Sequence, residues 1–420
     1  MKILIISRYF NPSQKIGAIR PTKIAKYLFN LGHDISIIIY DDTKKGFYLI
    51  ENIDSTDFEN TFSLIKKEKP NSKNNIKRKH SFIYDKIYPY YSLIHDLRDY
   101  YAFKKNLKIL KSYDAVFSTF STHSSHLIAR KYKVKFKNTV WISDFRDLPN
   151  QEGTPYFIKL YNKFFLRKIC NLANLITVVS DGMANDKQIS KYQNKILKLS
   201  NGYDKSDLHI KCKTNFEFEL NNKINFTYTG QLYNGKRDFS PLFKILSEII
   251  DENPTFNNKF RVNYAGSDFM YILMNARKYN LESILVNWGS ISREHSLKLQ
   301  EISDFLLIST WNTKREKGIV TGKLYEYMLS NKPVLGFVSG EVKNSEIKKI
   351  ISKTRIGYTF EEADFLLSHT EMKKFILDTI KKPNNHLKNL NTLEIKSYDY
   401  EYIAKRLEEE IMDYYESVYK

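Results

Sequence analysis

The chain has 420 residues, of which 42% are hydrophobic and 27% are charged. This length predicts two or three domains, because single hydrophobic cores stop growing near about 250–300 residues. The balance excludes a disordered chain, a collagen-like fibre and a low-complexity array. Two cysteines, Cys170 and Cys212, are too few for a disulfide framework or a Cys-based zinc site. The net charge of +20 favours anionic partners, with a general lysine-rich bias as the alternative explanation.

No apolar stretch is long enough for export or for crossing a membrane. The run Ile3–Ile6 is shorter than the about 7–15 apolar residues of a signal peptide, and Ile35–Tyr40 is far shorter than the about 18 of a bilayer span. We therefore expect a cytoplasmic protein, either soluble or held peripherally at the inner face of the plasma membrane.

Short β-branched runs alternate with stretches of helical periodicity in the first half of the chain. The predicted strands are Lys2–Ser7, Asp34–Tyr40, Asp114–Thr119, Thr139–Ser143 and Leu175–Ser180, and the predicted helices are Ala18–Leu31, Ser124–Tyr132 and Tyr156–Ala173. Continuous apolar strands separated by helices indicate a parallel sheet covered on both faces. The sequence thus predicts a doubly wound α/β domain over residues 1–204.

The same alternation resumes after the polar stretch 204–223, which we interpret as a linker. The predicted elements are the strands Ile224–Thr229, Phe260–Ala265, Ser283–Trp288, Asp304–Ser309 and Pro333–Val338, with the helix Ser240–Asp251 after the first of them. This pattern predicts a second Rossmann-like domain over residues 205–395.

The last segment, 396–420, contains a predicted amphipathic helix over Asp399–Lys420. Ile403, Leu407 and Ile411 fall on one stripe of it at four-residue spacing. Such a stripe needs an apolar surface to cover it, and we expect that surface on the first domain.

Three groups of residues in the first domain come after predicted strands, where ligands of parallel sheets bind. Gly17 stands before a helix, where its backbone can approach an anion, although a simple turn explains it equally. Asp144, Arg146 and Asp147 follow the strand Thr139–Ser143, and a structural ion pair is the alternative to a ligand site.

Two histidines follow the strand Asp114–Thr119 in the same way. Either His123 or His126 can face the ligand cleft, and a buried structural histidine is the alternative for each.

A glycine-bracketed loop opens the second domain. It begins at Gly230, directly after a strand, and ends in Lys236 and Arg237. Glycines allow a phosphate to approach the backbone and the two cations neutralise its charge, so the loop suits a diphosphate. The loop lacks the Gly-Lys-Ser/Thr ending of a P-loop.

The stretch after the strand Asp304–Ser309 carries a second charged pattern. Thr321 can cap a helix, and Lys323 and Glu326 then lie one turn apart on the same face. A cation near the helix start and a carboxylate one turn deeper suit the phosphate and ribose of a nucleotide. A surface salt bridge is the alternative explanation.

These stretches together resemble the family 4 retaining glycosyltransferases of the GT-B fold, of the type that builds bacterial surface polysaccharides. The resemblance covers nearly the whole chain and depends on the order and spacing of five segments. They are Arg8-Tyr9-Phe10 with Gly17, Asp144-Phe145-Arg146-Asp147, Ser200-Asn201-Gly202-Tyr203-Asp204, Thr229-Gly230 with Lys236, and Gly322-Lys323-Leu324-Tyr325-Glu326-Tyr327. The family implies two facing Rossmann-like α/β domains and a C-terminal crossover helix that returns to the first.

The resemblance also implies the reaction and the roles of single residues. A sugar would pass, with retention and without a metal or other cofactor, from a nucleotide-diphosphate sugar in the second domain to a saccharide or lipid-linked saccharide acceptor held mainly in the first. The implied catalytic residues are Lys236, Arg237 and His123. The implied donor-binding residues are Gly17, Gly230, Gly318, Ile319, Thr321, Gly322, Lys323 and Glu326. The implied acceptor or cleft residues are Asp144, Arg146, Asp147 and His126.

The sequence departs from the family pattern at two positions. Gln231 stands where the family often has an arginine, and Gly318 stands at the first glutamate of its Glu-x7-Glu pattern, with Glu316 two residues earlier. A non-catalytic nucleotide-sugar-binding protein and a sugar-nucleotide epimerase are therefore the alternative functions.

Two basic stretches suggest an anionic membrane surface as a further partner. The sequence has no aromatic–basic recognition motif, so we do not expect nucleic acid as a partner. One of the two stretches is Lys66–Lys79, for which a solvated loop is the alternative. The other is the helix Tyr156–Ala173. Its apolar side, including Phe157 and Phe165, predicts core packing, and Lys159, Lys163 and Arg167 lie opposite.

Overall fold

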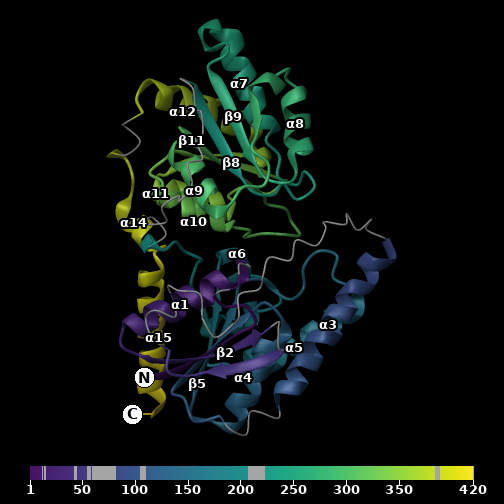
Figure 1. The fold of residues 1–420 in the computed structure, drawn as a ribbon, viewed down its shortest axis with the longest axis vertical. Helices are drawn as coiled ribbons and strands as arrows, with labels where there is room; N and C mark the ends of the chain where they lie inside the picture. The colour runs from purple at the N-terminus through teal and green to yellow at the C-terminus, as the bar shows by residue number, and fades with distance from the viewer. Residues whose placement is uncertain are drawn as a thin grey trace. The chain divides into compact units, whose positions relative to one another are not determined.

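The computed structural model describes residues 1–11, 13, 16–41, 45–53, 58, 82–104, 110–206, 223–383 and 388–419. Within them the chain forms two compact units, one of Met1–Asn201 with Tyr400–Lys420 and one of Gly202–Asp399. We call these unit 1 and unit 2 (Figure 1). The domain boundaries drawn from the sequence, after residues 204 and 395, lie close to these borders.

Unit 1 contains a seven-stranded sheet in the order β3-β2-β1-β4-β5-β6-β7. The strands are β1 (Lys2–Ser7), β2 (Asp34–Asp41), β3 (Gly46–Ile50), β4 (Ala115–Phe120), β5 (Val140–Phe145), β6 (Leu175–Val178) and β7 (Ile196–Lys198). All neighbours pair in parallel except β3, which pairs antiparallel with β2 at the edge. The sequence pattern predicted neither β3 nor β7. Because β3 runs antiparallel to β2, the sheet is mixed rather than wholly parallel.

The helices of unit 1 cover both faces of this sheet. They are α1 (Ile19–Asn30), α3 (Phe82–Lys104), α4 (His123–Lys135), α5 (Tyr156–Leu172), α6 (Asp181–Ala184) and α15 (Tyr400–Tyr419). Successive residues of a strand point to opposite faces, so Leu4 and Ile6 pack with α3, α4 and α5, while Ile3 and Ile5 pack with α1 and α15.

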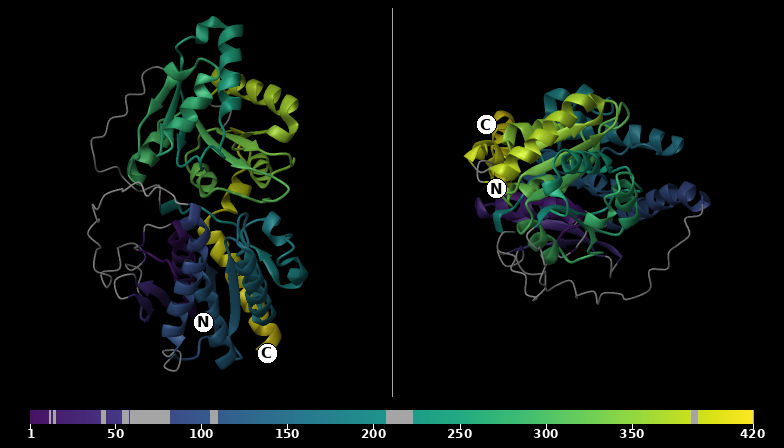
Figure 2. Two further views of the ribbon diagram at one scale, coloured as in Figure 1. Left: turned by 90° about the vertical axis from the view of Figure 1, so that its right-hand side faces the viewer. Right: turned by 90° about the horizontal axis from the view of Figure 1, so that it is seen from above.

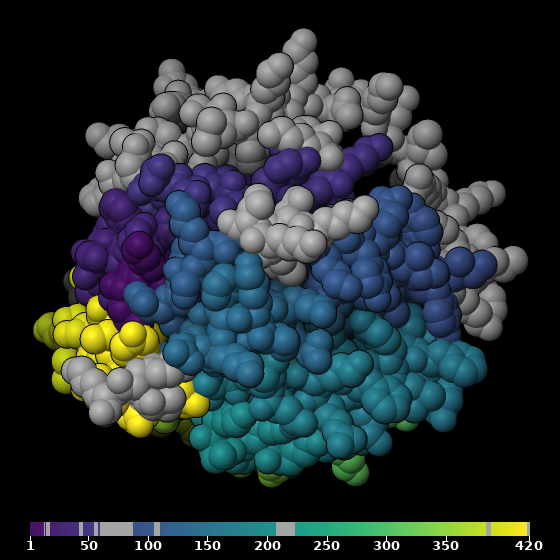
Figure 3. Space-filling view, turned by 90° about the horizontal axis from the view of Figure 1, so that it is seen from below, coloured from purple at the N-terminus to yellow at the C-terminus, as the bar shows by residue number. Residues whose placement is uncertain are grey.

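The chain end belongs to unit 1. In α15 the predicted stripe Ile403, Leu407 and Ile411 is buried, and the helix packs along α1. The yellow C-terminal segment lies beside the purple N-terminal one in Figure 3. The C-terminal helix is thus part of the first core although 198 residues of unit 2, Gly202–Asp399, precede it in the chain.

Unit 2 contains a wholly parallel sheet of six strands in the order β10-β9-β8-β11-β12-β13. The strands are β8 (Ile224–Thr229), β9 (Phe260–Ala265), β10 (Leu285–Asn287), β11 (Phe305–Trp311), β12 (Val334–Ser339) and β13 (Gly357–Glu361). The predicted strand Ser283–Trp288 is shortened, because Glu282–Ile284 form a turn of 3-10 helix before β10. The sequence pattern did not predict β13.

The helices of unit 2 are α7 (Ser240–Glu252), α8 (Phe269–Arg277), α9 (Arg293–Glu301), α10 (Gly322–Met328), α11 (Glu346–Thr354), α12 (Phe365–Lys381) and α14 (Thr392–Lys396). Aromatic side chains of β8, β9 and α7 fill the core on one side, while Leu324, Tyr327 and Met328 of α10 belong to a second cluster. Packing thereby fixes α7 and α10 against the sheet near the ends of β8 and β11.

Replacing Leu407 with alanine should destabilise unit 1 by about 2–5 kcal/mol, because it removes a fully buried side chain and leaves a cavity. Met412 is on the same helix and is 37% exposed, so Met412→Ala should change stability by only about 0.5 kcal/mol or less. Urea unfolding followed by the fluorescence of Trp141, with Trp288 and Trp311 replaced by phenylalanine, measures the difference. Equal midpoints for the two alanine variants would contradict the packing of α15 in this core.

Candidate functional site

The carboxyl end of β8 opens the candidate site in unit 2. Thr229 ends the strand and is buried, and the N–H of Gly230 donates to the Ala265 carbonyl at 2.7 Å. Gly230 has φ of +143°, which side-chain-bearing residues rarely adopt, and a Cβ there would lie 3.0 Å from Lys323 Cε. The glycine therefore lets the Lys323 side chain lie directly against the turn.

Helix α10 places Lys323 at this turn. The Thr321 hydroxyl caps the helix by accepting from the Lys323 N–H at 3.4 Å, and Leu324, the next residue, is buried in the core. Lys323 Nζ donates to Thr229 Oγ1 at 3.0 Å, and the ammonium forms no ion pair with any described residue. An ammonium has three N–H donors, so this one can still donate to an anionic ligand.

The charge on Lys323 is held in unfavourable surroundings. Burial lowers the pKa of its ammonium, an effect that nearby Glu326 opposes and that Arg293 and Arg237 reinforce. Like charges close together disfavour the charged form, so an anion bound here would relieve both the burial and the repulsion.

Glu326 is fixed by two side chains of α9. Its Oε1 accepts from Gln300 Nε2 at 2.8 Å and its Oε2 pairs with Arg293 Nη1 at 3.1 Å. Gln300 is buried and also donates to Thr229 Oγ1 at 3.1 Å. The sequence analysis missed Arg293 and Gln300. Their seven-residue spacing, which puts them on one helix face, is the signal that could have paired them.

Arg237 and Lys236 belong to different groups although they are adjacent in sequence. Arg237 Nη1 donates to the Tyr228 hydroxyl at 2.8 Å and interacts electrostatically with Lys323. Lys236 Nζ instead lies 3.9 Å from Glu316 Oε2 and 5.1 Å from the centre of the Trp311 ring. The structure thus groups Arg237 with Lys323, and no described contact joins Lys236 to Lys323.

The loop after β11 holds the remaining predicted donor residues. Gly318 has φ of +72°, in the left-handed region that favours glycine. The Ile319 carbonyl accepts from the Thr310 hydroxyl at 3.4 Å, and Gly322 begins α10. This backbone conformation disfavours a side chain, so the glycine at position 318 has a conformational reason. The carboxylate of this loop comes from Glu316, which accepts from Trp311 Nε1 at 2.6 Å.

Asp144 lies inside β5 rather than after it, contrary to the sequence expectation. It is fully buried and accepts hydrogen bonds from Arg20, Thr119 and Thr177. Burial alone would raise the pKa of its carboxyl, but Arg20 and the two hydroxyls hold it below the usual range. A buried carboxylate whose partners are all internal is a structural ion pair, so the structure does not present Asp144 to an acceptor.

His126 is also buried rather than facing a cleft. Its Nδ1 lies 2.7 Å from the Ser118 hydroxyl, and burial lowers its pKa to about 3. The ring is therefore neutral in the folded chain and contacts Phe145 and Phe165 of the core. His126 therefore fits the alternative that the sequence analysis gave, a buried structural histidine.

The other predicted residues of unit 1 lie near the carboxyl end of the sheet. His123 Nε2 lies 2.7 Å from Asn162 Oδ1, and burial lowers its pKa although Asn162 and Asp96 act in the opposite sense. Arg146 Nη2 donates to the Phe120 carbonyl at 3.3 Å, and the same guanidinium lies beside Gly17. Asp147 is exposed next to it. The structure thus brings Gly17 and Arg146 together.

Arg8 forms a buried cluster with two carboxylates of α3. The resemblance gave this arginine no role of its own. Its two Nη atoms lie 3.1 Å from Asp96 and 3.1 Å from Asp99, and its guanidinium stacks 4.0 Å from the centre of the Tyr40 ring. The ion pairs of Asp96 and Asp99 with Arg8 hold α3 beside the end of β1.

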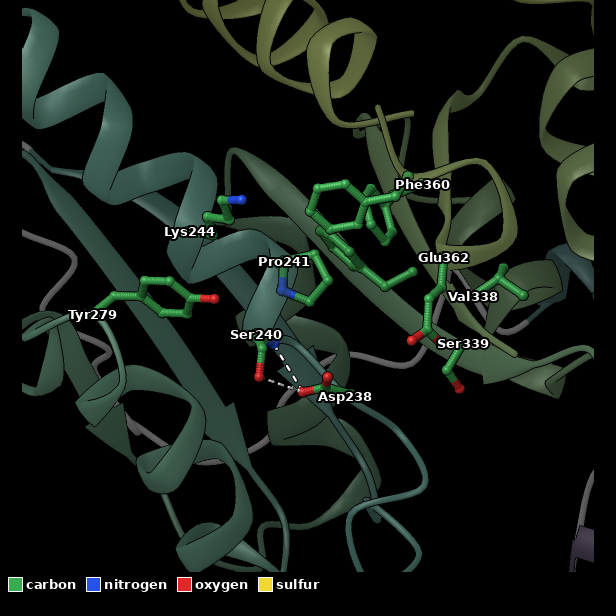
Figure 4. Close-up of a pocket in the computed structure, with 11 residues that line it drawn as sticks. Asp238, Ser240, Pro241, Lys244, Tyr279, Val338, Ser339, Phe360 and Glu362 are labelled. Carbon is green, nitrogen blue, oxygen red and sulfur yellow. Dashed lines mark hydrogen bonds between the residues drawn. The ribbon is translucent and has the colours of Figure 1, made fainter. Parts of the chain in front are cut away.

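A cavity of about 220 Å³ lies beside the start of α7 in unit 2 (Figure 4). Asp238 Oδ1 accepts from the Ser240 N–H and hydroxyl there, at 2.9 and 2.7 Å. The lining residues are Asp238, Ser240, Pro241, Lys244, Tyr279, Phe337, Val338, Ser339, Phe360, Glu362 and Phe365. None of the predicted donor ligands is among them, so this cavity is separate from the Lys323 group.

Some of the sequence predictions concern residues outside the described ranges, and others concern metal sites and membrane-spanning helices. The basic stretch Lys66–Lys79, most of the linker 204–223 and Cys212 lie outside the described residues. In the ranges that the structure does describe, no three His, Cys, Asp or Glu side chains gather to hold a metal ion. None of the described helices has the length and apolar character needed to cross a bilayer.

No model of a protein family matches the chain, and no curated protein matches it. Solved structures do match over nearly the whole length. The N-terminal domain of a trehalose-6-phosphate phosphatase from Candida albicans is 12% identical, with 98% of this chain and 97% of that one covered and a TM-score of 0.61. An E. coli trehalose-6-phosphate protein bound with UDP-2-fluoro glucose is 11% identical, with coverages of 98% and 99% and a TM-score of 0.61.

A third match is a Listeria monocytogenes protein provisionally described as a UDP-N-acetylglucosamine 2-epimerase. It is 12% identical, with 99% of this chain and 97% of that one covered and a TM-score of 0.54. At such identities the likeness shows the fold. The chain has the α/β architecture of two Rossmann-like domains with mainly parallel sheets that is found in GT-B proteins.

Replacing Arg20 with leucine should lower the free energy of unfolding by about 3–5 kcal/mol, because Asp144 would stay buried without its cationic partner. In the unaltered chain the pKa of Asp144 is depressed. The stability it contributes is thus complete above its unfolded pKa of about 3.9 and is lost as the pH falls through the lower folded value. In the Arg20→Leu variant the unpaired Asp144 carboxyl should have a raised pKa. Protonation then removes the buried charge, so the free energy of unfolding of the variant should increase as the pH is lowered from 7.

Urea unfolding at neutral and mildly acidic pH measures both effects. A double variant, Arg20→Leu with Asp144→Leu, removes the unpaired charge and should recover part of the lost stability. The account fails if Arg20→Leu unfolds at the same urea concentration as the unaltered chain.

Proposed function

We propose that the chain is a retaining glycosyltransferase of the family 4 kind. It would move a sugar from a nucleotide-diphosphate sugar to a hydroxyl of a saccharide or lipid-linked saccharide acceptor, in the cytoplasm. The observation that carries the proposal is the Lys323 ammonium, held at the carboxyl end of β8 by Thr229, with Glu326 one turn deeper on α10. Ligands of parallel sheets bind at this end of the strands.

The Lys323 group suits the diphosphate of the donor. Lys323 and Arg237 provide two positive charges, and Gly230 keeps the backbone between them free of a side chain. Cations hydrogen-bonded to phosphate form strong charge-assisted contacts. By the resemblance, the turn at Thr321 and Gly322 would add backbone donors.

Glu326 suits the ribose hydroxyls. Gln300 holds its Oε1, so the carboxylate keeps its orientation when a ligand arrives. Arg293 is about half exposed, and it can swing away from Oε2 so that a ribose hydroxyl donates there instead. The structure of α9 thus supports a ribose site on α10.

The chemistry of the proposed transfer needs stabilisation of a leaving group. The bond between the sugar's anomeric carbon and the diphosphate oxygen breaks, the acceptor oxygen bonds to the same face of that carbon, and the acceptor's proton passes to the leaving phosphate. Negative charge grows on the diphosphate, so fixed cations are the main catalytic device. Lys236, beside Glu316 and Trp311, is the proposed cation on the side of the loop after β11.

The glycine at position 318 supports one alternative. Without the family glutamate, the chain could bind a nucleotide sugar and never turn it over. A panel of nucleotide sugars, tested for release of the free nucleoside diphosphate with and without saccharide and lipid-linked acceptors, separates the functions. Acceptor-dependent release supports transfer, binding without release supports the non-catalytic alternative, and sugar isomerisation without release identifies an epimerase.

Replacing Lys323 with methionine should weaken binding of UDP or GDP about ten- to a hundredfold, because it removes one charged hydrogen bond to the diphosphate. Methionine keeps most of the side-chain volume, so the fold should be retained. Lys298→Met is the matched control, since Lys298 pairs with Glu301 at the surface of α9. Calorimetric titration measures both variants, and equal affinities would remove Lys323 from the proposed site.

Lys236→Ala should lower kcat with little change in donor KM, at a cost of about 2–4 kcal/mol in transition-state stabilisation. Glu326→Ala should do the reverse and mainly raise donor KM. Initial rates over a range of donor concentrations distinguish the two patterns. An alanine at 236 with unchanged turnover would refute its catalytic role.

A further inference from the structure

Two helices of unit 1 expose large apolar side chains in regular stripes. On α5, Phe157, Leu160 and Phe164 recur at three- and four-residue spacing, and Phe157 is 71% and Phe164 is 61% exposed. On α3 the exposed stripe consists of Ile87, Tyr91, Ile94 and Tyr101. Residues at this spacing lie on one side of a helix, so each helix presents a continuous apolar strip to solvent.

These stripes are additional to the sides that face the core. On α5 the buried residues include Ile158, Phe165 and Ile169, and on α3 they include Tyr100 and Phe103. The sequence analysis placed Phe157 with Phe165 on the core side, and the structure corrects this, because Phe157 points to the other side of α5. A helix that is apolar on two sides has one apolar side left for a partner.

The two helices that carry these stripes cover the same face of the sheet of unit 1. Helix α4 packs against both α3 and α5. His123 at its start lies 3.8 Å from Asp96 of α3 and 2.7 Å from Asn162 of α5. Figure 1 places the labels of α3, α4 and α5 together, and in the left view of Figure 2 these helices face the viewer. The helices therefore lie side by side in the order α3, α4, α5, and we call the outward sides of α3 and α5 together the α3/α5 face.

The α3/α5 face is bordered by positive charge. Helix α5 has four exposed cations, Lys159, Lys163, Arg167 and Lys168, and no aspartate or glutamate. On α3 the exposed Arg98 and Lys104 flank the stripe, whereas Asp96 and Asp99 are buried against Arg8. Among the described side chains of these two helices, every exposed charge is positive.

We propose that the α3/α5 face docks on an anionic phospholipid surface. Exposed Phe, Leu and Tyr side chains insert at the boundary between head groups and acyl chains, and flanking Lys and Arg side chains contact lipid phosphates. A second copy of this face is a poorer occupant, because it would place cations against cations. The inference uses none of the residues of the proposed nucleotide site and stands or falls independently of the sugar transfer.

Co-sedimentation of the full chain with lipid vesicles tests the proposal. We expect binding to vesicles of equal parts phosphatidylcholine and phosphatidylglycerol, little binding to pure phosphatidylcholine, and a loss of binding at high salt. The double variant Phe157→Ser with Phe164→Ser should raise the lipid concentration for half-maximal binding about tenfold or more. Lys159→Gln with Lys163→Gln should weaken binding and reduce its dependence on salt.

The matched control is Leu366→Ser with Leu367→Ser on α12, where the two leucines are 83% and 59% exposed. It removes two apolar side chains of similar exposed fraction from unit 2 and should leave vesicle binding unchanged. The circular dichroism spectrum and the urea-unfolding midpoint of each variant, measured separately, show whether that variant is folded.

Three results would overturn the inference. One is no binding to the anionic vesicles, and another is equal loss in the α5 and α12 variants. The third is a dimer, detected by light scattering, that the α5 substitutions dissociate while the vesicles bind nothing. In that last case the face joins two copies of the chain.

Discussion

The hydrogen bond from Lys323 to Thr229 is the interaction on which the candidate site of unit 2 depends. It draws a charged side chain of α10 to the end of β8, and the absence of a side chain at Gly230 makes room for it. Burying a charge costs free energy unless it is paired, and no described residue forms an ion pair with this ammonium. A bound anion would supply the missing partner, and the diphosphate of the proposed donor is such an anion.

In unit 1, the buried charges of Arg20 and Arg8 have carboxylate partners within the same unit. Arg20 and Asp144 pair with each other, and the surrounding hydroxyls and carbonyls complete their hydrogen bonds. Arg8 is satisfied in the same manner by Asp96 and Asp99. Such closed networks fix the positions of helices and strands but leave no capacity for a ligand. Whether a buried charge has an internal partner is thus what separates a structural group from a candidate site in this chain.

Much of the fold could be predicted from the sequence, because buried parallel strands such as Lys2–Ser7 and Ile224–Thr229 are continuous apolar runs. The edge strand β3 and the helix α3 lack that signal; α3 contains Pro89 and exposes much of its apolar surface. Local sequence correctly made Thr321 the cap of a helix that carries Lys323 and Glu326. It could not show that Asp144 is closed off by Arg20, 124 positions away, or that Gln300 holds Glu326, since both depend on tertiary contacts.

A crystal structure of the chain with UDP or GDP tests the central claim most directly. The account predicts that the diphosphate lies within hydrogen-bond distance of Lys323 Nζ and that the ribose hydroxyls meet Glu326 in place of Arg293. A nucleotide bound in the cavity beside α7, or one whose diphosphate makes no contact with Lys323, would contradict it.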